Sequence, residues 1–199
     1  MKKIFEITDP TMIHAILDQA EYGTLAVNEG EIPYAVPVNF ARIGEDIYFH
    51  GALSNRKMKA LRANPRVSFS VVESYAVIAS FFSSTEGSAC PATHFFKSVS
   101  IDGLASIVES REEKAAMFTA LMEKLQPEGG YKPFTEESYD KVLRATAVVK
   151  ITPSTTRAKF KFGQHLDEER FEMIITHLQQ RGTAKDLETV ALMHQMRNT

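Results

Sequence analysis

The chain has 199 residues, of which 44% are hydrophobic and 24% charged, and this is the composition of an ordinary globular protein. Its formal charge of -2 predicts no bulk attraction to nucleic acid or to an anionic membrane, so any anion site must be local. A single cysteine, Cys90, excludes an intramolecular disulfide and a multi-cysteine zinc site. The opening MKKIFEITDP lacks the apolar core of a signal peptide, and no stretch reaches the roughly 18 apolar residues of a membrane span. We therefore expect a cytoplasmic protein.

The first quarter of the sequence predicts a helix followed by a three-stranded meander. Asp9 and Pro10 suit the N-cap and first turn of a helix that ends near Gly23. Turn signals then divide the chain into strands that we expect over 22–28, 32–42 and 46–51. Because Pro33 and Pro37 lack an amide donor, the middle strand is expected to be irregular or to have an exposed edge where a ligand could meet its backbone.

The rest of the chain alternates further strands with inserted helices. Strands are expected over 67–73, 76–82, 95–109 and 146–153, with a loop over 83–94. Helices are expected over 54–64, 135–144, 167–181 and 184–196. Another helix is expected to begin at the capping box formed by Ser110 and Glu113. The helix after Ser110 is expected to bury Ala116, Met117, Ala120, Leu121 and Leu125.

This order of elements predicts an α+β fold that is mainly β. Five or more short antiparallel strands favour a barrel or strongly curved sheet over a doubly wound parallel sheet. A glycine inside the long strand 95–109 predicts a bulge or bend, and barrels close through such bends.

The segment IYFHGALSNRKMKAL, residues 47 to 61, carries an unfavourable charge arrangement. Ser54 suits an N-cap, and Arg56 and Lys57 lie in the first helical turn, where the helix dipole opposes cations. A phosphate between these groups would remove the conflict, and Gly51 and Ala52 would let the backbone approach it. The alternative is a solvated basic face on the surface of the helix.

Four segments in order, YGTLAVN, PYAVPVNFAR, IYFHGALSNRKMKALRANPRVSFSV and FFKSVSIDGLA, resemble the flavin-binding split-barrel family related to pyridoxamine 5'-phosphate oxidase. They look most like the branch of nitroimidazole-resistance proteins, over roughly residues 10 to 155. The resemblance implies an antiparallel FMN-binding split β-barrel with inserted and C-terminal helices. It implies a flavin-binding domain over 1–165 and a helical extension over 166–199 packed on the same domain.

The resemblance also implies the residues that contact the cofactor. Phosphate would be held by Ser54, Arg56 and Lys57. The resemblance places Pro37, Val38, Asn39 and Phe40 along the ring and His50 close to the flavin. Further cofactor-binding residues would be Gly51, Ala52, Lys97, Ser98 and Val99, with Lys97 at the position that grips phosphate in relatives, and Lys161 and Gln164 would lie near the cofactor. Relatives usually have arginine where this chain has Lys97, and lysine keeps the charge but loses the bidentate fork.

The histidines and the segment KFKFGQH are the remaining candidates for chemical roles. No catalytic acid or base can be identified from the sequence, and His50 is the candidate, either as a hydrogen-bonded structural residue or as a substrate contact or proton donor. The six histidines show no HExxH or paired spacing, so no metal site is expected. In KFKFGQH, residues 159 to 165, strand alternation predicts that Phe160 and Phe162 face inward and that Lys159 and Lys161 are solvated.

The sequence thus leads to a flavoprotein hypothesis with an open alternative. We expect an FMN-dependent oxidoreductase that reduces or oxidises a small molecule with a nicotinamide nucleotide or another donor, with FAD left open. The alternative is a flavin- or haem-binding module that stores or senses its ligand without turnover, with histidine as a haem ligand. The family implies a homodimer with flavin at the subunit interface, and we expect neither nucleic-acid nor membrane binding. The substrate and electron donor are not indicated.

Overall fold

The structure is a computed structural model that describes residues 2–197. Its contacts divide the chain into two compact units. Unit 1 comprises residues 2–9, 72–98 and 158–197, and unit 2 comprises residues 10–71 and 99–157. These two units are not the same as the two predicted parts, a flavin-binding domain over 1–165 and a helical extension over 166–199. The domain boundaries therefore remain a prediction.

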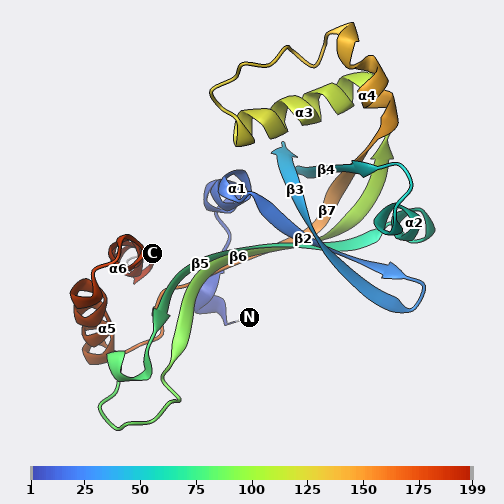
Figure 1. The fold of residues 1–199 in the computed structure, drawn as a ribbon. Helices are drawn as coiled ribbons and strands as arrows, with labels where there is room; N and C mark the ends of the chain where they lie inside the picture. The colour runs from blue at the N-terminus through green and yellow to red at the C-terminus, as the bar shows by residue number, and fades with distance from the viewer. Residues whose placement is uncertain (1, 198–199) are drawn as a thin grey trace. The chain divides into compact units, whose positions relative to one another are not determined.

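Seven strands and six α-helices make up the described chain (Figure 1). The strands are β1 (Glu6–Ile7), β2 (Tyr22–Glu29), β3 (Ile32–Ile43), β4 (Asp46–Ala52), β5 (Arg66–Ile78), β6 (Thr93–Val108) and β7 (Thr146–Lys161). The α-helices are α1 (Pro10–Gln19), α2 (Arg56–Ala63), α3 (Arg111–Leu125), α4 (Asp140–Ala145), α5 (Glu168–Arg181) and α6 (Ala184–Arg197). Short 3₁₀ turns occur at Lys3–Phe5, Ser80–Phe82 and Glu137–Tyr139.

The strands form a closed antiparallel ring. Their order is β1-β7-β4-β3-β2-β5-β6, and an additional pairing of β7 with β6 closes it. Each pair with a defined register is antiparallel, as in the meander of β2, β3 and β4. The predicted mainly antiparallel split-barrel fold is therefore confirmed.

Strand alternation builds the core of unit 2. Inward-facing side chains are almost fully buried on every strand of the meander and its neighbours, including Leu25, Phe40, Phe49, Phe69 and Ile151. The ring of Phe40 meets that of Phe69 edge-on, with centroids 4.9 Å apart. Two glycines are required by close packing here. A Cβ at Gly23 would lie 2.0 Å from the Phe69 ring, and one at Gly103 would lie 2.5 Å from the carbonyl oxygen of Thr152.

Two strand predictions were wrong in length. Residues 67–73 and 76–82 were expected as separate strands, but β5 runs unbroken to Ile78 because Tyr75 is buried in place of a turn. The strand expected over 146–153 continues to Lys161. The sequence predicts a connector in its polar middle, but Ser154 and Arg157 there bond to Asp102 of β6, so the exposed face of this strand is polar.

The helices follow the predicted positions with local differences. Ser110 caps α3 by accepting from the amide of Glu113, but the Glu113 carboxylate accepts from the Tyr48 hydroxyl instead of closing the capping box. The buried face of α3 is formed by Lys114, Ala115, Met117 and Leu121, whereas Ala116 is exposed and Leu125 is 44% exposed. Met117 and Leu121 were predicted correctly.

Unit 1 contains the two C-terminal helices, α5 and α6, as predicted. Gly182 ends α5 in the left-handed conformation, with φ of 66°. Phe160 and Phe162 are 2% and 0% exposed, which confirms the inward alternation predicted for this stretch. Within residues 2–197, no helix is long and apolar enough to cross a membrane.

Candidate functional site

The start of α2 differs from the prediction by one residue. Asn55, not Ser54, is the N-cap, because its side-chain oxygen accepts from the amide of Met58 at 2.9 Å. Ser54 lies exposed just before it. The sequence SNRK contains two residues that suit an N-cap, and local pattern alone did not separate them. The first amides of α2 remain without intrahelical partners, as at any helix start.

Lys57 folds back over the end of β4. A Cβ at Gly51 would lie 2.9 Å from Lys57 Cε and 3.2 Å from its Nζ, so glycine is what allows this approach. The ammonium group also lies 5.3 Å from the centre of the Phe49 ring. Burial lowers the pKa of Lys57, and among residues 2–197 no carboxylate forms an ion pair with it. A half-buried cation without a counter-ion is a favourable place for an anion.

Arg56 has different surroundings. Its Nε donates to Glu29 Oε2 at 2.7 Å, and its guanidinium lies 4.2 Å from the centre of the Tyr34 ring. Both members of the ion pair are substantially exposed, at 52% and 42%. The two neighbouring cations of the predicted cradle are therefore not equivalent: Lys57 is available to an anion, whereas Arg56 is already paired.

The PVNF segment of β3 presents alternate residues to different sides. Val38 and Phe40 are 5% and 0% exposed and belong to the core, so a ligand could meet only their backbone. Pro37 and Asn39 face the other way, and the Asn39 amide donates to the carbonyl of Glu21 at 3.0 Å. β3 pairs with β4 only at residues 40–43, whereas β2 pairs with its other side over residues 32–39. The segment 32–39, with Pro33 and Pro37, thus has the exposed edge that the prolines predicted.

His50 lies at the end of β4, beside Lys57. Its ring centroid is 5.2 Å from that of Phe118 on α3. Burial, and next the charge of Lys57, lower the pKa of His50, so the imidazole is neutral at pH 7. A neutral imidazole can accept a proton or a hydrogen bond, or ligate a metal. Ala52 is exposed beyond Gly51.

The remaining predicted residues divide between the units. Val99, in unit 2, is 1% exposed and belongs to the core. Lys97 and Ser98 are half-buried in unit 1, where Lys97 Nζ lies 4.9 Å from the centre of the Tyr75 ring. Burial lowers the pKa of Lys97, against the opposing charges of Glu73 and Glu188.

Lys161 and Gln164, also in unit 1, have local roles. Lys161 donates to the hydroxyl of Thr93. Gln164 uses both ends of its amide on the backbone: its oxygen accepts from the Phe162 amide and its nitrogen donates to the Phe160 carbonyl, each at 2.8 Å. The Gln164 side chain thereby holds the end of β7.

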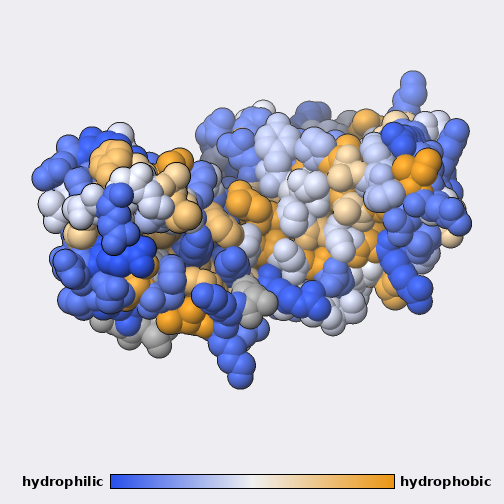
Figure 2. Space-filling view, turned by 90° about the horizontal axis from the view of Figure 1, so that it is seen from below, coloured by the Kyte–Doolittle hydropathy of each residue, from blue (hydrophilic) through white to orange (hydrophobic). Residues whose placement is uncertain are grey.

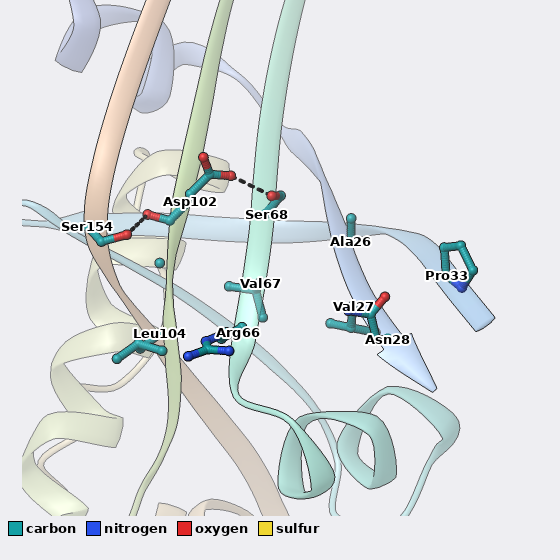
Figure 3. A pocket seen from close by; sticks show the side chains of 11 residues that line it. Ala26, Val27, Asn28, Pro33, Arg66, Val67, Ser68, Asp102, Leu104 and Ser154 are labelled. Atoms are coloured by element: carbon teal, nitrogen blue, oxygen red, sulfur yellow. Dashed lines mark hydrogen bonds between the residues drawn. The ribbon is translucent and has the colours of Figure 1, made fainter. Parts of the chain in front are cut away.

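A groove that the sequence did not indicate crosses the strands of unit 2 (Figure 3). It encloses about 570 Å³ and is lined by residues of β2, β3, β5, β6 and β7. Figure 3 shows Ser68 and Ser154 on either side of Asp102; Ser68 donates to its carboxylate at 2.6 Å and Ser154 to its carbonyl at 2.9 Å. Leu104 is 53% exposed at this groove. The sequence singled out only Pro33 among its lining residues, as part of an exposed edge, because the others come from strands far apart in the chain.

Lys124 is another feature of unit 2 that the sequence did not single out. Its Nζ donates to the carbonyls of Leu17 and Phe40 at 2.9 and 3.2 Å and lies 3.8 Å from the centre of the Phe40 ring. Burial lowers the pKa of Lys124 to about 8. The residue ties α1 and α3 to the PVNF strand, across sequence separations that no local pattern reveals.

Solved structures with the same fold include several cofactor-binding proteins. A flavocytochrome from Azotobacter vinelandii is 25% identical, with a TM-score of 0.69, covering 86% of this chain and 78% of that one. An FAD- and haem-binding protein from Mycobacterium smegmatis is 22% identical, with a TM-score of 0.66, covering 79% and 74%. A candidate 5-nitroimidazole antibiotic resistance protein from Bacteroides thetaiotaomicron VPI-5482 is 21% identical, with a TM-score of 0.62, covering 77% and 85%. No curated protein matches the chain.

The family model described as pyridoxamine 5'-phosphate oxidase matches residues 9–160. This span contains β2 to β6, almost all of β7, and the Gly51–Lys57 contact at the start of α2. The chain therefore belongs to the pyridoxamine 5'-phosphate oxidase family of split-barrel proteins.

Proposed function

We propose that this protein binds a flavin, as FMN, and uses it to oxidise or reduce a small molecule in the cytoplasm. The observation that carries the proposal is the half-buried Lys57 amine, which lies against Gly51 at the start of α2 and has no carboxylate partner in the described part of the chain. A phosphate ester supplies the charge that this arrangement lacks, and the free amides of the first helical turn add donors to it. The solved flavin-binding neighbours with this fold support the same cofactor class.

The chain's own residues would bind and orient the cofactor. Lys57, with Ser54 and the amides of α2, would hold the phosphate, and the exposed edge of β3 at Pro37 and Asn39 would lie along the ring. Lys97 and Ser98 are proposed contacts carried over from the family pattern. The flavin supplies hydride or electron chemistry when bound. His50, neutral and beside Lys57, is placed to hold or accept a proton near that site.

The difference between Lys57 and Arg56 gives a direct test. Lys57→Met removes a charge-assisted contact worth about 1.5–3 kcal/mol, so the Kd for FMN should rise by roughly one to two orders of magnitude. Arg56→Met removes a side chain already paired with Glu29 and should raise the Kd for FMN by less than Lys57→Met does. Fluorescence quenching of FMN by apoprotein measures both constants, and circular dichroism checks the fold of each variant.

Three results would contradict the proposal at different levels. A colourless protein that takes up no FMN or FAD supplied in excess would remove flavin binding itself. Equal FMN affinity in wild-type protein and Lys57→Met would remove Lys57 from the site. A flavin-loaded protein that neither NADH, NADPH nor dithionite bleaches would remove the oxidoreductase activity.

A haem-binding module is the second candidate, favoured by the exposed, neutral imidazole of His50. Its test is the absorption spectrum after addition of haemin: a Soret band that shifts in wild-type protein but not in His50→Ala would support it. Homodimerisation, with each subunit contributing to the flavin site, is proposed from the family pattern.

A further inference from the structure

Unit 1 contains a cavity of about 240 Å³ that the flavin proposal does not use. Its walls come from the segment before β6, the end of β7, the turn that follows and α5. Polar and charged residues on this wall are Ser83, Cys90, Thr93, Lys161, His165 and Arg170, and an apolar part is formed by Phe95, Leu166 and Ile174. We call it the Lys161–Arg170 cavity.

Positive charge in this cavity is not balanced by carboxylates. Lys161 Nζ donates to the Thr93 hydroxyl, and Arg170 Nε donates to the Ser83 carbonyl at 3.2 Å. Both partners are neutral, and among residues 2–197 neither cation forms an ion pair. By contrast, Arg181 and Arg197 of the same unit are paired with Asp186 and Glu168. The hydrogen bonds of Lys161 and Arg170 therefore use one donor of each cation on a neutral oxygen and leave the positive charge of both uncompensated by an ion pair among residues 2–197.

The electrostatic effect of this imbalance is visible in the neighbouring groups. Burial, and next the charge of Lys159, lower the pKa of Lys161. Burial lowers the pKa of His165, with further contributions from the charges of Lys2, Lys161 and Arg170. The charges of Lys161 and Arg170 thus disfavour the protonated form of His165, and an anion among these groups would relieve that repulsion.

Cavity size limits the ligand. At about 240 Å³ the cavity is below the roughly 300–1,000 Å³ of pockets that hold drug-sized ligands, so a whole flavin does not fit. Lysine and arginine together recognise carboxylate and phosphate oxygens, the arginine by paired donors. The apolar wall of Phe95, Leu166 and Ile174 offers contact to a short carbon skeleton.

We propose that the Lys161–Arg170 cavity binds a small oxyanion, a carboxylate or phosphate group on a molecule much smaller than a flavin. Lys161 and Arg170 hold the oxygens, and the hydroxyls of Ser83 and Thr93 and the ring of His165 surround them. The site is independent of the start of α2, and the inference does not rest on the proposed flavin.

The test is isothermal titration calorimetry of the full chain with inorganic phosphate and, separately, with succinate, at constant ionic strength. Saturable binding of at least one of the two anions is expected. Lys161→Met and Arg170→Met should each weaken it by at least about tenfold, because each removes a charged donor. The matched control is Lys159→Met, which removes the same charge from the same strand outside the cavity wall and should change the Kd by less than about twofold. Arg170→Lys, which keeps the charge, should recover part of the loss.

Other outcomes would overturn the inference. These are no saturable binding of either anion, equal weakening by Lys159→Met and Lys161→Met, or competition between FMN and the anion, which would assign Lys161 to the flavin site. Flavin content, read from absorbance of the same samples, distinguishes these results from failure of the proposed function. A colourless protein that still binds phosphate through Lys161 would retain this site and lose the other.

Discussion

At the scale of single residues, Arg56 and Lys57 show why adjacent cations need not share a role. Arg56 points to Glu29 and Tyr34, where an exposed ion pair contributes only about 0–1 kcal/mol. Lys57 instead lies over Gly51 and next to His50, half-buried and with no counter-ion among the residues that the structure describes. A lysine on the solvent-facing side of the first turn of α2 would be an ordinary surface charge. Lys57 is half-buried and able to bind an anion because it lies over the end of β4.

His50 reports on the charge of Lys57. Because a positive charge disfavours imidazolium, Lys57→Met should raise the pKa of His50 toward its ordinary value of 6.5. The increase should be incomplete, since burial, the larger cause, remains. NMR titration of the His50 ring protons measures this pKa, and Arg56→Met should leave it unchanged. A His50 pKa that is the same in Lys57→Met and wild-type protein would contradict the closeness of the two groups.

At the scale of elements, Gly103 determines how closely β6 and β7 approach. Its missing side chain allows the Thr152 carbonyl into the space that a Cβ would occupy. Bending at such a glycine is one way in which a curved antiparallel sheet closes. The glycine at which a bulge or bend is predicted thus lies where β6 approaches β7, and the pairing of these two strands closes the ring.

Gly103→Ala should destabilise the protein. A methyl group 2.5 Å from a backbone oxygen forces the two strands apart, and overpacking of this kind costs about 1–3 kcal/mol. Urea denaturation followed by circular dichroism measures the free energy of unfolding. Ser100→Ala, at an exposed position of the same strand, is the control and should change it little. Equal stability of the two variants would show that β6 moves freely at Gly103.

Lys124 connects three elements and makes their packing depend on pH. Its pKa is about 8 in the folded protein against 10.5 ordinarily, so between these values the unfolded chain binds more protons. Titration of Lys124 should therefore increase the free energy of unfolding as the pH rises from 8 to 10. Lys124→Met should be less stable than wild-type protein at pH 7, because the carbonyls of Leu17 and Phe40 lose their donor.

The comparison of these two proteins at several pH values tests the prediction. The stability difference between wild-type protein and Lys124→Met should widen between pH 8 and 10, as measured by urea denaturation. Lys141→Met removes an exposed lysine and should show no such trend. A difference that stays constant or narrows over this range would contradict a depressed pKa for Lys124.

At the scale of the molecule, the apolar surface of unit 2 is relevant to self-association. Figure 2 shows hydrophobic residues exposed among polar ones on the face seen from below. Exposed apolar side chains of unit 2 include Tyr22, Ile32 and Leu104, at 59%, 62% and 53%. Leu104 also lines the 570 Å³ groove, whose floor is formed by strands and not by a covering helix. Apolar side chains gathered on a surface are typical of interfaces, and these three are candidates for one.

Leu104→Glu should weaken the proposed homodimer. A charge placed in an apolar interface costs desolvation even with Arg66 in the same groove, so sedimentation velocity should show a larger monomer fraction than for wild-type protein. Val142→Glu, at another position that is 52% exposed, is the control. If the flavin lies at the interface, Leu104→Glu should also lose FMN on dilution. A wild-type protein that sediments as a monomer with bound FMN would contradict the proposed shared site.

The sequence by itself determined the features that depend on neighbouring residues. Alternation placed Phe160 and Phe162 inward, the turn signals separated β2, β3 and β4, and Gly182 ended α5. The family could be predicted for the same reason, since its motifs are short and continuous in the chain. Hydrogen bonds and side-chain directions repeat along one element, so a local pattern is enough to specify them.

Only the tertiary structure decided which charges are free and which are paired. Glu29 reaches Arg56 across 27 positions, Lys124 reaches Phe40 across 84, and Lys161 meets Thr93 across 68. The length of β7 was decided in the same way, because its polar middle is held by Asp102 of a neighbouring strand. Burial and charge compensation are properties of the space around a side chain, and residues distant in sequence fill that space. The chemical availability of Lys57, Lys161 and Arg170 therefore follows from the fold and not from their motifs.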